Sequence, residues 1–236
     1  TSLGRLEEAL RLDPNDAYLF DAYVAEVKAR RGAPAVIETL EAGVGRFMNC
    51  FTTVGTLLNE YLLAGAYDKL DDFAARVNLP YFWRPSFGRT WALAKMARGY
   101  RKLQEKEYDE ALALFEASGR IPETLEKNYL EDEPVRARRL FYTGYCRSKL
   151  GNTAGAAEAW TAALDIQRHI RFEASYNFTL MQARYYQAYC LRGLGRSREA
   201  NTYLRSIREF ASSSGMDNAS PVGRTALFSR VPRTST

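Results

Sequence analysis

The chain has 236 residues, of which 46% are hydrophobic and 13% aromatic, so it can bury a substantial core. Its 33 Lys and Arg against 28 Asp and Glu give a net charge of +5, and the basic residues are spread along the chain. Nucleic-acid-binding proteins usually concentrate Lys and Arg in one stripe, so no nucleic-acid partner is predicted. No apolar run approaches the roughly 18 residues that suggest a membrane span, so no membrane partner is predicted either.

Hydrophobic periodicity predicts about six helical pairs in chain order, the first of them incomplete. Residues 3–14 form the second half of a pair and end at Pro14. The next pairs are 17–31 with 34–44, 51–64 with 67–77, 91–104 with 108–117, 138–166 around a turn at 151–152, and 180–193 with 198–210. Residues 80–85 form an aromatic connector, and residues 119–133 form an acidic loop or a helical turn between repeats. Residues 211–236 are rich in Ser, Thr, Gly and Pro, which predicts an irregular tail.

Turn residues recur at a nearly constant interval, which indicates internal repeats. The turn residues are Gly32, Gly65, Lys106, Gly151 and Gly195, separated by 33, 41, 45 and 44 residues. Five residues after three of these turns comes an alanine expected to face inward: Ala111, Ala156 and Ala200. Ile37 and Leu70 occupy this position in the second and third pairs. Each pair is too narrow to bury its own apolar side and must stack on its neighbours.

The pattern Gly144, Gly151, Ala156, Trp160 and Ala163 resembles the signature of tetratricopeptide repeats. The segments LEEALRLDP and YDEALALFEAS are similar to second helices of the same family. This resemblance implies an all-α fold, a right-handed α-solenoid of about six antiparallel pairs over residues 1–210, followed by the tail 211–236. It also implies that the first helix of each pair lines a concave face. The later periods exceed the usual ~34 residues, so the helices or connectors are longer.

Residues 122–160 are also similar to the tetratricopeptide region at the C-terminal end of some large bacterial proteins. The N-terminal part of those proteins is an uncharacterised, carbohydrate-related domain. This second resemblance implies that the chain is a fragment of a longer polypeptide, with a covalently linked upstream domain.

Alignment on the turn residues predicts a binding groove along the first helices. Asn59, Tyr100, Tyr145 and Tyr189 each lie six residues before their turn residue. The predicted groove adds Arg138, Phe141 and Lys149 from the fifth pair, and Gln182, Tyr185 and Arg192 from the sixth. Tyrosine presents a flat apolar face and a hydroxyl at little entropic cost, which suits peptide recognition, and Arg binds carboxylates bidentately. The alternative is that the tyrosines only pack between adjacent first helices.

No residue pattern predicts catalysis, a metal or a cofactor. Cys146 and Cys190 both lie five residues before a turn glycine, which predicts buried packing residues. With Cys50 the cysteines number three, without metal or redox spacing, so a reducing and therefore cytoplasmic setting is expected. His169 is the only histidine and is expected at a helix end or connector, so neither a zinc site nor a Ser-His-Asp triad is predicted.

The sequence therefore predicts a non-catalytic scaffold that binds a protein or peptide. Only Asn59 fits the Lys, Asn and Arg set with which some tetratricopeptide proteins bind C-terminal carboxylates, so that clamp is not predicted. An alternative is an accessory or oligomerisation domain of a larger, carbohydrate-active bacterial enzyme, acting as a homo-oligomer or through its upstream domain. A small-ligand sensor would require an enclosed cavity.

Overall fold

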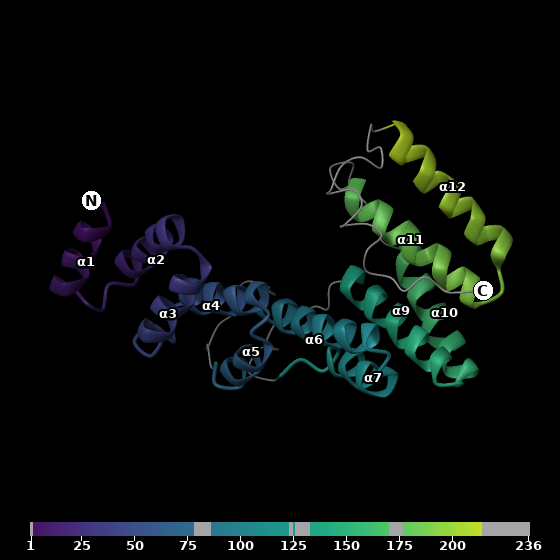
Figure 1. Ribbon diagram of the computed structural model, residues 1–236, viewed down its shortest axis with the longest axis horizontal. Helices are drawn as coiled ribbons and strands as arrows, with labels where there is room; N and C mark the ends of the chain where they lie inside the picture. Colours follow the sequence, from purple (N-terminus) through teal and green to yellow (C-terminus); the bar gives the residue numbers. More distant parts are fainter. Residues whose placement is uncertain (1, 78–85, 123–124, 126–132, 170–176, 214–236) are drawn as a thin grey trace. The chain divides into compact units, whose positions relative to one another are not determined.

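Residues 2–77, 86–122, 125, 133–169 and 177–213 are described by the computed structural model, and every regular element among them is a helix (Figure 1). The helices are α1 Ser2–Leu12, α2 Ala17–Arg31, α3 Ala33–Gly43, α4 Phe51–Ala64, α5 Tyr67–Ala74, α6 Ser86–Gln104, α7 Tyr108–Ala117, α9 Glu133–Lys149, α10 Thr153–His169, α11 Asn177–Gly193 and α12 Ser197–Ser213. The prediction of consecutive helical pairs is confirmed. The connector at 80–85 and the tail from 214 onward lie outside the described residues, and the right-handed solenoid stays a prediction.

The chain divides into two compact units, and the boundary falls inside α6. Unit 1 comprises residues 1–98 and 117–131, and unit 2 comprises residues 99–116 and 132–236. Unit 1 therefore contains α1 to α5 and most of α6. Unit 2 contains the end of α6, together with α7 and α9 to α12.

Four of the predicted turns share one backbone geometry. Gly65, Lys106, Gly151 and Gly195 all have a positive φ between 64° and 81°. At Gly151, its N–H donates to the Ser148 carbonyl at 3.2 Å, and the next N–H donates to the Arg147 carbonyl at 2.9 Å. The same two bonds recur at the other three turns. This is the Schellman arrangement, which satisfies the last carbonyls of the first helix and reverses the chain.

The inward position after each turn is confirmed for four pairs and corrected for one. Leu70, Ala111, Ala156 and Ala200 are all buried, and each N–H donates to the carbonyl four residues earlier, just after the turn residue. In the α2–α3 pair Val36, not Ile37, makes this bond, and Val36 is fully buried whereas Ile37 is half-buried. The prediction of Ile37 is wrong because α3 begins directly after Gly32, one residue earlier than the other second helices.

In two of the unit-2 pairs a small residue on the first helix faces a large one on the second. Gly99 lies against Phe115, and Gly144 lies against Trp160. Trp160 also contacts Gly193 on the next first helix, α11. A Cβ at either Gly144 or Gly193 would overlap the indole ring, so both glycines are required for this approach. The buried indole N–H is satisfied because it donates to the Phe141 carbonyl at 3.2 Å.

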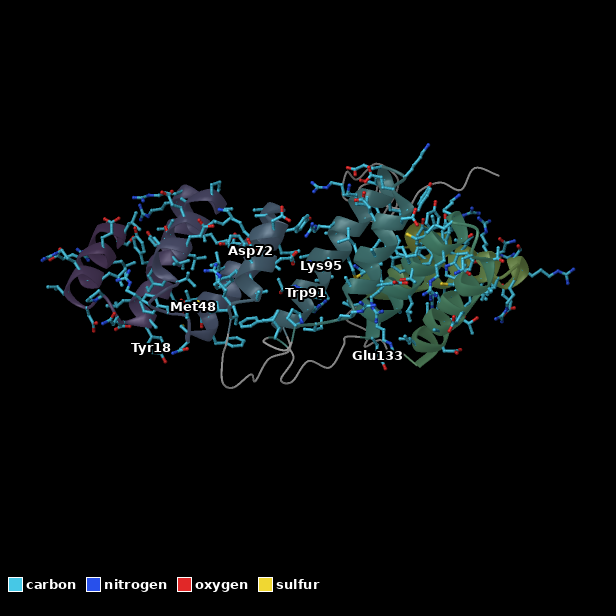
Figure 2. All side chains as sticks on the ribbon, turned by 90° about the horizontal axis from the view of Figure 1, so that it is seen from below. Tyr18, Met48, Asp72, Trp91, Lys95 and Glu133 are labelled. Atoms are coloured by element: carbon cyan, nitrogen blue, oxygen red, sulfur yellow. The ribbon has the colours of Figure 1, made fainter. Side chains whose placement is uncertain are left out.

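Polar side chains contribute several of the contacts between helices of unit 1. Glu60 is buried on α4 and accepts a hydrogen bond from Lys28 on α2, while Asp21 accepts one from Thr53 at 3.1 Å. Further polar contacts link α3 to α4 (Tyr61 to Glu41), α3 to α5 (Lys69 to Glu41) and α5 to α6 (Lys95 and Arg98 to Asp71). The Lys95 ammonium also lies 5.3 Å from the centre of the Trp91 ring on the same helix (Figure 2). Paired in this way, the partly buried charges of unit 1 are compensated.

We expect Lys106→Gly to stabilise the protein by about 0.5–1 kcal/mol, because a left-handed conformation is strained for every residue except glycine. Lys106 is the only described residue other than glycine with a positive φ. Urea unfolding of the two proteins measures the change. The matched control is Gly151→Lys at the equivalent turn, which should destabilise the protein by a similar amount. A less stable Lys106→Gly variant would contradict the shared turn geometry.

Trp160→Ala should cost about 3–5 kcal/mol, because it empties the space between two glycine-containing helices. Trp160→Phe should cost less, but still about 1 kcal/mol or more, because the indole hydrogen bond to the Phe141 carbonyl is lost and the smaller ring leaves part of the space empty. The matched control is Tyr18→Ala, whose ring is exposed and whose removal should change the free energy of unfolding by less than about 0.5 kcal/mol. Equal costs for Trp160→Ala and Tyr18→Ala would rule out the proposed role of Trp160 in joining the pairs.

Candidate functional site

Each first helix has one narrow face that the packing of the pairs does not fully cover. Its residues are spaced by seven and then four positions, so they lie above one another on the helix surface. In unit 1 this face comprises Tyr18, Ala25 and Ala29 on α2 and Thr52, Asn59 and Leu63 on α4, all exposed. In unit 2 it comprises Tyr100 and Gln104 on α6, Arg138, Tyr145 and Lys149 on α9, and Tyr189 and Gly193 on α11, all half-buried or exposed. We call these sets the unit-1 stripe and the unit-2 stripe.

The three tyrosines of the unit-2 stripe are half-buried, with one side packed and the other open. Tyr100 meets the ring of Tyr142 edge-on at 5.8 Å. Tyr189 lies 4.6 Å from the Tyr185 ring, and Tyr145 has the Lys149 ammonium 5.5 Å from its ring centre. Tyr100 contacts Tyr142 of α9 and Tyr189 contacts Phe141 of α9, so these two tyrosines do pack between adjacent first helices, as the alternative predicts. Because one side of each ring stays open, a role of these tyrosines in partner recognition is kept as a proposal.

Two predicted groove residues belong to the core instead. Phe141 is only 2% exposed, and its ring contacts Tyr142, Tyr186 and Tyr189 at 5.0–6.4 Å. The physical reason is that Phe141 lies on the side of α9 that faces the next first helix. Tyr185 is 9% exposed and packs with Ile207 of α12, so it offers little surface to a partner.

The remaining predicted residues lie on or beside the stripes. Arg138 is half-buried, with its guanidinium 5.8 Å from the Tyr186 ring, and Arg192 is exposed beside Tyr189 on α11. Asn59 is exposed on α4, in unit 1. Gln182 belongs to α11, but its side chain lies outside the described residues. The structure thus brings Arg138, Tyr145 and Lys149 together on one face of α9.

A buried aromatic cluster supports the unit-2 stripe from beneath. The Tyr142 ring stacks on Phe115 at 5.0 Å, and its hydroxyl lies 3.5 Å from that of Tyr186. Burial, and then the neighbouring Tyr186, raise the pKa of Tyr142 well above its ordinary value. Burial also raises the pKa of Tyr145 on the stripe itself. These phenols stay neutral at physiological pH, which suits packing and hydrogen bonding rather than acid–base chemistry.

The unit-1 stripe contains exposed apolar residues that the sequence reasoning missed. Tyr18 is 89% exposed and projects from α2 into solvent (Figure 2), and Leu63 is 68% exposed on α4. Applying the unit-2 offsets of 13 and 2 residues before the turn glycine would have found Thr52 and Leu63. The same offsets do not find Tyr18, because the turn at Gly32 is one residue shorter and Tyr18 lies one position outside the offset of 13.

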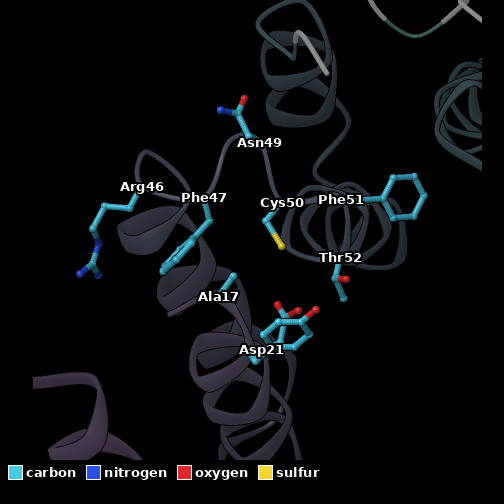
Figure 3. A pocket seen from close by; sticks show the side chains of 9 residues that line it. Ala17, Asp21, Arg46, Phe47, Asn49, Cys50, Phe51 and Thr52 are labelled. Carbon is cyan, nitrogen blue, oxygen red and sulfur yellow. The ribbon is translucent and has the colours of Figure 1, made fainter. Parts of the chain in front are cut away.

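A pocket of about 460 Å³ lies where the N-terminal ends of α2 and α4 meet the α3–α4 loop. It is lined by Ala17, Tyr18, Asp21, Arg46, Phe47, Asn49, Cys50, Phe51 and Thr52. Cys50 and Asp21 point toward each other, whereas Arg46 and Phe51 point away from the centre (Figure 3). This pocket includes two residues of the unit-1 stripe. Because it is wide open to solvent, it does not enclose a small ligand.

Neither metal-ligand clusters nor membrane-spanning helices occur in the part of the chain that the structure describes. No group of three or more His, Cys, Asp and Glu side chains there could hold a metal ion. None of the described helices is both long and apolar enough to cross a bilayer. The side chain of His169, the single histidine, lies outside the described residues.

No family model matches the chain, and no curated protein is similar to it. Among solved structures it is similar to MamA residues 41-end from Desulfovibrio magneticus RS-1, with 14% identity, a TM-score of 0.45, and 84% of this chain and 96% of that chain covered. A putative kinesin light chain with nearly identical TPR-like repeats from Podosopora anserina has 14% identity, a TM-score of 0.46, and coverages of 86% and 98%. At these identities and TM-scores, the repeat architecture rests on the turns and packing described above.

Thiol reactivity should separate the three cysteines. Cys146 and Cys190 are fully buried, as predicted, and burial raises the pKa of Cys146 to about 12 and that of Cys190 further. Their thiolates are therefore scarce in the native state, whereas Cys50 is half-buried at the pocket. At about pH 8, Ellman's reagent should modify Cys50 alone in the native protein and all three thiols after unfolding. Rapid native modification of a Cys50→Ser variant would contradict this assignment.

Proposed function

We propose that the chain is a non-catalytic scaffold that binds a protein or peptide along the outward stripes of its first helices. The observation that carries this proposal is that the same helix face stays open in successive pairs and holds large aromatic and aliphatic side chains. Tyr18 and Leu63 are largely exposed there, and Tyr100, Tyr145 and Tyr189 are half-buried. Exposed apolar groups gathered on one face favour an interaction site over an ordinary solvated surface.

The tyrosines on the stripe suit partner recognition because their rings are already held by packing. Tyr189 is fixed against Tyr185, and Tyr100 against Tyr142, so little side-chain entropy would be lost on binding. Cations at the edge add polar donors, with Lys149 above Tyr145 and Arg192 one helical turn from Tyr189. In the family that the sequence resembles, this side of the first helices faces the concave surface, and binding there is part of the proposal.

The experiment selects binders of the whole chain from a library of random displayed peptides. Titration calorimetry then measures the affinity of each recovered peptide for the chain. Tyr145→Ala should weaken binding by about tenfold or more, because the partner loses an aromatic surface. The matched control is Tyr203→Ala, which removes a half-buried tyrosine from a second helix, α12, and should leave the affinity unchanged. Circular dichroism establishes that both variants are folded. Peptides that bind wild type and Tyr145→Ala equally would refute the stripe as the binding face.

A further inference from the structure

Charge is divided unequally between the first and second helices of unit 2. The first helices, taken as residues 99–104 of α6 with α9 and α11, contain one carboxylate, Glu133, and nine basic residues: Arg101, Lys102, Arg136, Arg138, Arg139, Arg147, Lys149, Arg184 and Arg192. The second helices α7, α10 and α12 contain four basic residues and seven acidic ones: Asp109, Glu110, Glu116, Glu158, Asp165, Glu199 and Glu209. The excess of positive charge in this unit therefore belongs to the helices that carry the stripe.

Part of this charge is used inside the fold. Lys102 forms ion pairs with Glu107 and Glu110 at the start of α7. Arg147 pairs with Glu116 of α7 at 3.1 Å and donates to the Gly155 carbonyl. These contacts link first helices to second helices, and they use two of the seven second-helix carboxylates, Glu110 and Glu116. They do not involve Lys149 on the stripe or Arg192 beside it.

Three cations of the unit-2 first helices are exposed and have no carboxylate partner among the described residues. Arg101, Lys149 and Arg192 form no ion pair with any residue that the structure describes. Lys149 instead lies over the Tyr145 ring, where the ring quadrupole attracts the ammonium but does not neutralise it. Near Tyr145 and Tyr189, the stripe and its edge thus combine tyrosine rings with the positive charge of Lys149 and Arg192.

We infer that the unit-2 stripe binds an acidic segment of a partner protein. This inference rests on the proposed function and adds the chemistry of the partner. Lys149 and Arg192 receive its Asp and Glu carboxylates, and the open sides of Tyr145 and Tyr189 receive its backbone and apolar groups. Complementary charge steers such a segment to the stripe and sets its register. A nucleic acid fits less well, because the unpaired cations are separated by tyrosines and do not form a continuous row that would follow a phosphate backbone.

The test is the composition of peptides selected by the whole chain and by two charge-reversed variants. The stripe variant is Lys149→Glu with Arg192→Glu. The control variant is Arg205→Glu with Arg208→Glu, which reverses two exposed arginines on α12 and changes the net charge by the same amount. Wild type and the control should enrich Asp and Glu about twofold over the starting library. The stripe variant should lose this enrichment and favour Lys and Arg, because the charge at the site has changed sign.

Binding of one selected acidic peptide gives the second measurement. Its affinity should fall about tenfold or more for the stripe variant, less than about twofold for the control, and steeply with added salt. Selected peptides without Asp and Glu enrichment, but with affinity that depends on Tyr145, would overturn the acidic partner and leave the scaffold proposal standing. Equal losses for the two variants would overturn it as general charge attraction. An oligonucleotide that binds more tightly, with the same sensitivity to the stripe variant, would replace the peptide with nucleic acid.

Discussion

The contact of Trp160 with two first helices is the constraint on which the stacking of pairs in unit 2 depends. A single helical pair cannot cover its apolar side, so some side chain must contact both its own pair and the next pair. The indole does so because Gly144 and Gly193 have no side chains to keep α9 and α11 away from it. Its N–H is satisfied by the Phe141 carbonyl, so the buried polar group costs little. The position of α11 on α9, and hence the spacing of their stripe residues, follows from this contact.

The same two positions accommodate different side chains in different pairs, provided that their combined volume is kept. The first position lies seven residues before the turn residue, and the second lies nine residues after it. In unit 2 these positions hold Gly99 and Phe115, Gly144 and Trp160, and Ala188 and Leu204. In unit 1 the sizes are exchanged, with Leu58 on the first helix and Ala74 on the second, both fully buried. Volume-conserving exchange of this kind preserves packing density. It also explains why a pattern that requires a small residue on the first helix fits unit 2 better than unit 1.

The backbone-determined features could be predicted from sequence, whereas features set by neighbouring helices could not. Turns at Gly65, Gly151 and Gly195 follow from the need for a positive φ, which glycine meets without strain. Counting five residues from Gly32 predicts Ile37 at the inward position, whereas Val36 occupies it. The count fails because the sequence does not show that the loop between α2 and α3 is one residue shorter. Phe141 was assigned to the groove because periodicity gives the direction of a side chain on its own helix. Whether another helix covers that side of α9 depends on the position of α11, which the periodicity of α9 does not predict.

The stripe is informative because packing dictates its residues only in part, through one side of Tyr100 and Tyr189 and through Gly193. At the turns and inward positions the pairs repeat the same solution, since each must reverse the chain and bury the same surface. At the stripe the backbone geometry is equally regular, yet unit 1 has Ala25 and Leu63 where unit 2 has Tyr145 and Lys149. Folding alone would tolerate any exposed polar residue at such positions. The exposed side chains of Tyr18 and Leu63 in unit 1, and the open sides of the tyrosines near Lys149 and Arg192 in unit 2, are the groups that the proposed contacts with a partner would use.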